Sequence, residues 1–202
     1  GVFTPYGEVF DVGGTTEAAI RRFQNGVEPL KCGLNHYKHN GNGSLMRILP
    51  LALFPSRMSD INNVSGLTHA HDVSRLACRT YVAMAEQLLK GSPSAWKNFD
   101  RSPQIHKLNR DEIRSTGYVV DTLEAALWCV YHTTSYRDCV LTAVNLGGDT
   151  DTIAAVAGGL AGIIYGCGSE KGIPDEWIAQ IARKDWISDL CGRFEMVQVS
   201  TR

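Results

Sequence analysis

Apolar residues recur at helical spacing through the middle of this chain. The clearest case is the segment HDVSRLACRTYVAMAEQLLKG, residues 71–91, which ends at Gly91. Its apolar stripe comprises Val73, Ala77, Tyr81, Met84 and Leu88. Three- and four-residue spacing places such positions on one face of an α-helix, and a glycine after the last of them is a common stop signal. We therefore predict a long amphipathic helix here.

A shorter helix is predicted near the start of the chain. The segment TTEAAIRRFQNG, residues 15–26, has Thr15 and Thr16 as alternative N-caps and Gly26 as a stop.

Two more helices are predicted from their capping patterns. DTLEAALWCVYH opens with Asp121 and has Glu124 three residues later, the spacing of a capping box. The second segment is SYRDCVLTAVNLGG, residues 135–148. Its Ser135 and Asp138 have the same spacing, and we expect the helix to stop at the glycine pair 147–148. The chain is thus rich in helix signals.

Strand signals are few. EVFDV, residues 8–12, is short, and EMVQVS, residues 195–200, is ambiguous. Polar connectors lie at 26–43 and 91–110, and we expect the second to be a mobile loop. The best interpretation is one all-α domain over residues 1–202.

Composition narrows the possible functions. With 20 Lys and Arg against 21 Asp and Glu in 202 residues, the chain has no basic field that would make nucleic acid its default partner. Its longest run without polar residues, 153–165, is too short to span a bilayer, and residues 1–14 do not resemble a signal peptide. The six cysteines form no CxxC pair and predict free, mostly buried thiols in a reducing cytoplasm.

An acidic turn, GGDTDT at 147–152, is the strongest candidate for chemistry. Residues two apart on a helix point in different directions, so Asp149 and Asp151 converge only if the backbone turns between them. Gly147 and Gly148 permit such a turn. Two carboxylates and a hydroxyl form a hard oxygen ligand set that suits Mg²⁺ or Mn²⁺. The alternative is that one aspartate only caps the following helix.

The helix after the acidic turn is built from small residues, AAVAGGLAG at 154–162. Glycine inside a helix costs roughly 1 kcal/mol relative to alanine. We expect close approach of neighbouring helices as compensation, which would hold the acidic turn rigidly.

A glycine turn, Gly41-Asn42-Gly43-Ser44, precedes an apolar helical segment. Such turns can expose N–H groups that bind phosphate, but a plain N-cap role for Ser44 is the commoner explanation of such a pattern. His69 and His71, in LTHAHD, have a poor spacing for two metal ligands on a helix. Tyr118 directly precedes a predicted helix, so its ring could face a pocket or belong to the core.

These blocks occur together and in order, and their combination resembles the ADP-ribosylglycohydrolase family. The matching stretches are FDVGGTTEAAIRRFQNG, GNGSLMRILPLALF, LTHAHD, GYVVDTLEAALW and AVNLGGDTDTIAAVAGGLAGIIYG, with IPDEWI toward the C-terminus. The resemblance implies an all-α, orthogonal helix bundle with a binuclear Mg²⁺ or Mn²⁺ centre. It also implies hydrolysis of the bond between ADP-ribose and a protein side chain, or of a related small ADP-ribosyl compound.

The resemblance also implies roles for individual residues. Asp149 and Asp151 would be catalytic, and together with Thr152 they would bind metal, with Asp151 the better candidate to bridge two ions. The substrate-binding residues would be Gly41, Asn42, Gly43, Ser44, His69 and Tyr118. Of these, His69 would contact the ligand and Tyr118 would pack on adenine. His71 carries no such role and is expected to be structural.

Family members usually carry a Thr-Asp-Asp-Thr loop in an N-terminal part, which supplies further metal ligands, and this sequence has none. We therefore expect the chain to correspond to the larger, C-terminal part of the family domain. Three hypotheses follow: a hydrolase active when the other part is supplied, a non-catalytic module that binds ADP-ribose or a nucleotide, and an oligomer-forming remnant. A homodimer or the missing segment would be the partner, and the cytoplasm the expected location.

Overall fold

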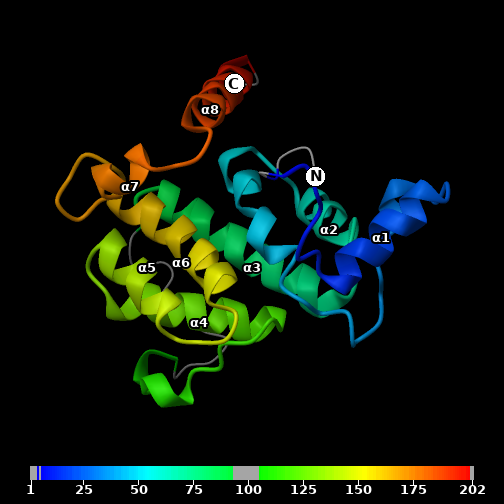
Figure 1. Ribbon diagram of the computed structural model, residues 1–202, viewed down its shortest axis with the longest axis horizontal. Helices are drawn as coiled ribbons and strands as arrows, with labels where there is room; N and C mark the ends of the chain where they lie inside the picture. The colour runs from blue at the N-terminus through cyan, green and yellow to red at the C-terminus, as the bar shows by residue number, and fades with distance from the viewer. Residues whose placement is uncertain (1–3, 5, 93–104, 201–202) are drawn as a thin grey trace.

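The structure, a computed structural model, describes residues 4, 6–92 and 105–200, and all regular elements in these ranges are helices (Figure 1). The α-helices are α1 (Gly14–Gln24), α2 (Met58–Gly66), α3 (Asp72–Leu89), α4 (Val119–His132), α5 (Tyr136–Val144), α6 (Thr150–Tyr165), α7 (Asp175–Ala179) and α8 (Lys184–Ser200). The 3₁₀ helices are η1 (Pro29–Lys31), η2 (Leu45–Arg47), η3 (Leu49–Leu53), η5 (Ile105–Lys107) and η6 (Arg110–Glu112). Over the described ranges the backbone forms isolated β-bridges but no strand.

The core lies where α6 packs against α3, α4 and α5 (Figure 1). α3 has the predicted stripe, with four of its five residues buried and Val73 packed against the core. The small residues of α6 permit close contact, because a Cβ at Gly159 would lie 2.5 Å from the Tyr81 hydroxyl. That hydroxyl donates to the Val156 carbonyl at 2.8 Å. The expected compensation for glycine in this helix is confirmed.

Two predicted helix starts are wrong. α1 begins at Gly14 with Gly13 as N-cap, and neither threonine caps it, because Thr15 instead contacts His39 at 3.3 Å. α4 begins at Val119, so Asp121 lies inside its first turn, where other side chains bind its carboxylate. In both cases another side chain contacts the one that was expected to cap.

Other expectations about the helix ends are confirmed. The hydroxyl of Ser135 accepts from the Asp138 N–H at 3.0 Å and caps α5. Gly26 and Gly91 both have positive φ after their helices.

The two weak strand signals give no strand. Residues 8–12 lie outside any regular element, and residues 195–200 belong to α8. Most of the connector expected to be mobile, residues 93–104, lies outside the described residues.

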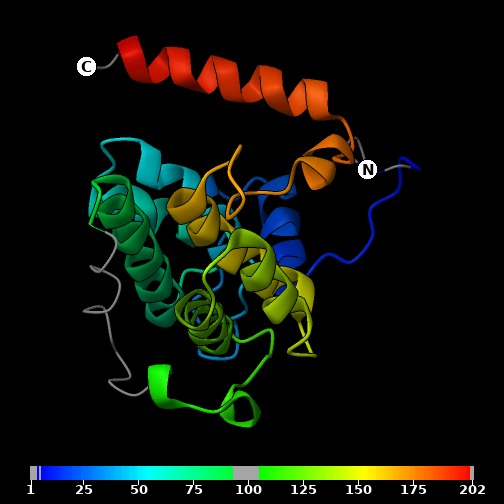
Figure 2. The ribbon, with the colours of Figure 1, turned by 90° about the vertical axis from the view of Figure 1, so that its left-hand side faces the viewer.

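The last helix, α8, lies along one side of the molecule, apart from the packed helices (Figure 2). Phe194 meets Phe54 edge to face at 4.4 Å between ring centroids. Trp186, Ile187 and Leu190 are exposed. No helix in the part of the chain that the structure describes is long and apolar enough to cross a bilayer.

All six cysteines are free, as the sequence predicted. Cys32, Cys78, Cys129 and Cys139 are buried, whereas Cys167 and Cys191 are exposed. Burial raises the pKa of Cys129 to about 12 and that of Cys139 to about 11.

Candidate functional site

The glycine turn and the acidic turn, 107 residues apart in sequence, meet at one hydrogen bond. The side-chain amide of Asn42 donates to Oδ2 of Asp149 at 2.6 Å. The same amide nitrogen donates to the Thr122 hydroxyl at 2.9 Å, at the start of α4. Asn42 is buried, so three segments converge on one side chain.

The acidic turn has its shape because of the two glycines before Asp149. Gly147 and Gly148 have φ angles of +89° and +66°, a region that residues with a Cβ rarely occupy. A Cβ at Gly148 would lie 1.9 Å from the Ser115 carbonyl oxygen. The Asp149 N–H donates to that same oxygen at 3.2 Å. The turn is therefore pressed against the loop 114–118.

Asp149 occupies the N-cap position of α6, but its side chain makes no capping hydrogen bond. Its carboxylate is half-buried and faces Asn42 instead. The structure therefore does not support capping as the role of the Asp149 side chain. Asp151 is exposed on the first turn of α6, and Thr152 is buried directly after it.

Backbone pairing fixes the glycine turn beside the start of α4. Gly41 and Tyr118 form an isolated antiparallel bridge, and the Asn42 N–H donates to the Gly117 carbonyl at 3.0 Å. Ser44 precedes a 3₁₀ helix and makes no capping hydrogen bond, so the N-cap interpretation of Ser44 is wrong. Its hydroxyl is fully buried and accepts from the Cys78 thiol at 3.5 Å, because the turn packs directly on α3.

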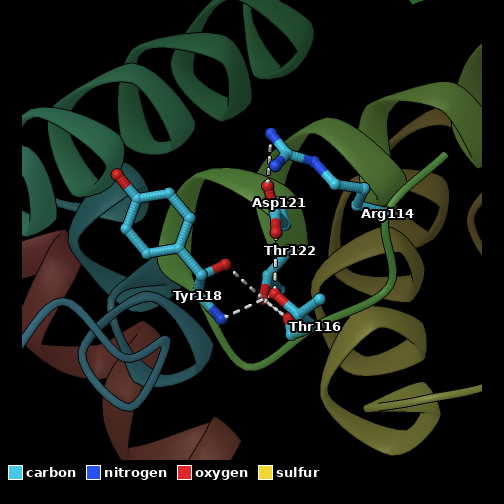
Figure 3. A network of polar contacts seen from close by, with 5 residues as sticks. All are labelled: Arg114, Thr116, Tyr118, Asp121 and Thr122. Atoms are coloured by element: carbon cyan, nitrogen blue, oxygen red, sulfur yellow. Dashed lines mark hydrogen bonds and ion pairs between the residues drawn. The ribbon is translucent and has the colours of Figure 1, made fainter.

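Asp121 organises the loop that supports both turns (Figure 3). Its buried carboxylate accepts from the Thr116 hydroxyl at 2.7 Å and pairs with Arg114 at 3.2 Å. The Tyr118 N–H donates to the Thr116 hydroxyl at 3.1 Å, and the ring of Tyr118 points away from this network (Figure 3). Tyr118 is 42% exposed, so its ring is available to a ligand rather than part of the core.

His69 lies against the glycine turn. A Cβ on Gly43 would lie 2.9 Å from its Cε1, and a Cβ on Gly41 would lie 3.5 Å from its Nε2. The ring is almost entirely buried, and burial, with smaller contributions from Arg47 and His39, lowers its pKa to about 4. His69 is therefore neutral at physiological pH.

His71 is structural, as expected. It occupies the N-cap position of α3, and its Nδ1 accepts from the Val73 N–H at 3.3 Å. The same nitrogen is 3.0 Å from the side-chain nitrogen of Asn40, a buried residue just before the glycine turn.

Sequence reasoning missed two residues that shape the site. Arg47 is partly buried and donates to the carbonyl of Gly43, and Thr122 accepts from Asn42. Arg47 is the one charged residue in the otherwise largely apolar run SLMRILPLALF, and that position was a signal that its side chain has partners inside the protein. Thr122 gave no comparable signal, because its partner is 80 residues away.

The structure thus brings together most of the predicted site residues. Gly41, Asn42, Gly43, His69, Tyr118 and Asp149 lie around one convergence of the glycine turn, the start of α4 and the start of α6. Asp151 and Thr152 follow on α6. Among the residues that the structure describes, no group of three or more His, Cys, Asp or Glu side chains could hold a metal ion.

Comparison with known proteins identifies the class of this fold and site. A model of the ADP-ribosylglycohydrolase family matches residues 3–202. A solved chain described as an ADP-ribosylglycohydrolase-related protein complex superposes with a TM-score of 0.74 and 27% identity, over 88% of this chain and 66% of that one. The chain belongs to the ADP-ribosylglycohydrolase family.

Two curated relatives show how far the similarity extends. ADP-ribosylarginine hydrolase Tri1 of Serratia proteamaculans (strain 568) is 33% identical, over 91% of this chain and 54% of its own length. ADP-ribosyl-[dinitrogen reductase] glycohydrolase of Rhodospirillum rubrum is 31% identical, over 86% of this chain and 61% of its own. The chain spans little more than half the length of these relatives.

Proposed function

We propose that this chain takes part in the hydrolysis of the glycosidic bond that links ADP-ribose to a protein side chain. The observation that carries the proposal is the Asn42–Asp149 hydrogen bond, which joins a glycine turn suited to ligand binding to an acidic turn suited to a cation. Two relatives are named for hydrolysis of ADP-ribosyl linkages, one of them to arginine. An arginine-linked substrate is therefore the first to test.

The glycine turn, His69 and Tyr118 are the proposed ligand-binding residues. Tyr118 offers an exposed aromatic face on which an adenine ring could stack. Gly41 and Gly43 let the His69 ring pack directly on the turn, and this neutral histidine can donate or accept a hydrogen bond.

Mg²⁺ or Mn²⁺ is the proposed cofactor, held by Asp149, Asp151 and Thr152. These hard oxygen donors suit such a cation, but three of them make an incomplete shell, so water or other protein groups would complete it. When bound, the cation would orient ribose hydroxyls and lower the pKa of a water molecule. Asp149 would then act in a fixed position, because Asn42 holds one of its oxygens.

The test is calorimetric titration of ADP-ribose into the 202-residue chain, with Mn²⁺ present and then with a chelator. We expect binding that depends on the metal and that is lost in Asp151→Ala. Asp175→Ala is the matched control, because Asp175 is also an exposed aspartate in the first turn of a helix, α7. Unchanged binding in Asp151→Ala would contradict the role proposed for this residue.

A turnover assay follows on arginine-linked ADP-ribose, with the same variants. Release of ADP-ribose that requires Mn²⁺ and Asp151 would support hydrolysis by this chain.

A second candidate function is ADP-ribose binding without hydrolysis. The described part of the chain contains no group of three or more His, Cys, Asp or Glu side chains that could hold a metal ion, and this favours binding without hydrolysis. Binding that persists in chelator, without release of product from the arginine-linked substrate, would favour this second function over the first.

A further inference from the structure

Arg47 is a cation without a carboxylate partner in the ranges that the structure describes. It is partly buried, and burial lowers its pKa from the ordinary arginine value. A guanidinium in such a place needs acceptors for its fork of N–H donors. It finds them on two separate segments.

The first segment is the glycine turn, where Nη1 of Arg47 donates to the Gly43 carbonyl. The second is the end of α2 and the residues just after it. Nη2 donates to the Thr68 hydroxyl at 2.6 Å and to the Val64 carbonyl at 3.3 Å. One side chain therefore ties the glycine turn to the segment that carries His69.

The Thr68 hydroxyl also lies 2.7 Å from Nδ1 of His69. This oxygen already accepts from Arg47, and it has one proton to give. Donation of that proton to Nδ1 gives both the Thr68 hydroxyl and Nδ1 a hydrogen-bond partner. Nδ1 of a neutral histidine is then an acceptor, so the ring proton must sit on Nε2.

Nε2 lies on the side of the ring that faces the glycine turn. A Cβ on Gly41 or on Gly43 would lie 3.5 Å from this atom. The recorded hydrogen bonds of the described residues give it no protein partner. An N–H donor is thus left beside the glycine turn, where the ligand is proposed to bind.

We propose that Arg47 and Thr68 are positioning residues that fix His69 as the neutral Nε2–H tautomer and hold it against the glycine turn as a hydrogen-bond donor to the ligand. The assignment of a ligand to this surface rests on the proposed function, whereas the tautomer and its cause do not. The ligand group that this donor suits is an acceptor oxygen, on a ribose or a phosphate. Because the donor is neutral, it discriminates by geometry rather than by charge.

Nitrogen-15 NMR of the histidine rings, recorded without ligand, tests the tautomer directly. His69→Gln identifies the His69 signals. We expect the Nε2–H pattern in the native chain, and in Thr68→Val a mixture of tautomers with a pKa raised by about one unit, because a bond to the neutral form is lost. Thr68→Ser keeps the hydroxyl and should restore the native pattern.

Arg47→Lys and Arg47→Met separate the charge from the forked geometry. Both should shift the His69 signals, and Arg47→Met should shift them further, because it removes a nearby positive charge that helps to lower the pKa of His69. Thr68→Val serves if the Arg47 variants fail to fold. A native tautomer and an unchanged pKa in Thr68→Val would overturn the proposal.

The effect on the ligand is measured separately. If ADP-ribose binds the native chain, Thr68→Val should bind it roughly tenfold more weakly, the equivalent of one hydrogen bond, and Thr68→Ser should bind normally. Absence of ADP-ribose binding in every form would count against the proposed function, while the NMR result would still decide the role of Arg47 and Thr68.

Discussion

The glycine turn and the acidic turn form one site, but they are held in place by different means. The glycine turn is fixed by paired polar groups: its backbone pairs with the residues before α4, and Asn42, His69 and Arg47 all have partners inside the protein. The acidic turn depends on backbone shape: Gly147 and Gly148 are left-handed, and the turn is hydrogen-bonded to Ser115 through the Gly147 carbonyl and the Asp149 N–H. Its Asp151 carboxylate is exposed to solvent.

This difference suggests that the two turns have different roles in the site. Buried, paired polar groups are costly to disturb and resist rearrangement, so they suit a surface that must keep its shape. An exposed carboxylate at the start of a helix is free to bind a cation without first breaking an internal contact. The two turns can therefore be tested separately, by changing the backbone of one and the hydrogen bonds of the other.

The largest effect is expected from Gly148→Ala. An alanine here would have to adopt a left-handed backbone conformation. Its Cβ would also lie 1.9 Å from the Ser115 carbonyl oxygen. We expect a loss of about 3 to 5 kcal/mol in the free energy of unfolding. Gly147→Ala is the matched control, because φ is also positive there but the space around it is open, and it should cost about 1 kcal/mol. Equal losses in urea unfolding would mean that Ser115 does not hold the turn.

Acid should destabilise the glycine turn through His69. Its pKa is lowered from 6.5 to about 4, so the unfolded chain binds a proton that the folded chain does not. The stabilisation is complete above pH 6.5 and is lost as the pH falls toward 4, a total of about 3 kcal/mol.

The measurement is urea unfolding at pH 7 and pH 4.5 for the native chain and for His69→Gln. The variant should lose less stability between the two pH values, whereas His36→Gln, at an exposed histidine, should behave like the native chain. Identical pH dependence in the native chain and His69→Gln would show that His69 is not the group responsible.

A smaller loss, about 2 kcal/mol, is expected for Asn42→Ala. This change leaves the buried Thr122 hydroxyl and the Asp149 carboxylate without their shared donor. The same change can be made in a Thr122→Val background, where the contact with the Thr122 hydroxyl is absent. If Asn42→Ala costs as much stability there as in the native chain, the Asp149 contact provides most of the loss. A thermal melt of the four forms separates the two contacts.

The smallest effect is expected for Asp151→Asn. Because this side chain is exposed, the unfolding free energy without metal should change by less than about 0.5 kcal/mol. With Mn²⁺ present, the native chain should become more stable and the variant should not, since only a form that binds the cation gains stability from it. A large loss without metal would show that Asp151 has a structural role.

Periodicity and capping signals predicted the presence of α1, α3, α4 and α5, whereas α2, α7 and α8 were not predicted. α3 follows its predicted limits closely, and α5 begins after its predicted Ser135 cap, but α5 ends at Val144, before the predicted stop at 147–148. The starts of α1 and α4 could not be predicted in this way. Thr15 and Asp121 would serve as caps in an isolated helix, but in the fold His39 and Thr116 are available to them.

The site was predicted in its parts and not in its assembly. Local motifs marked the glycine turn and the acidic turn as candidates, and the family resemblance added His69 and Tyr118. The hydrogen bond between Asn42 and Asp149 could not be predicted, because side-chain contacts across 107 residues leave no local pattern. For the same reason Arg47 appeared as an isolated charge, and its two acceptor segments became visible only in the fold.

The distribution of the cysteines has a practical consequence for spectroscopy. Of the six thiols, the two exposed ones are Cys167, just after α6, and Cys191, in α8. A thiol-reactive dye or spin label should therefore attach to these two positions first, without any engineered substitution. The pair would report the separation between α8 and the core helices, and so whether that helix keeps its position when ADP-ribose or Mn²⁺ is added.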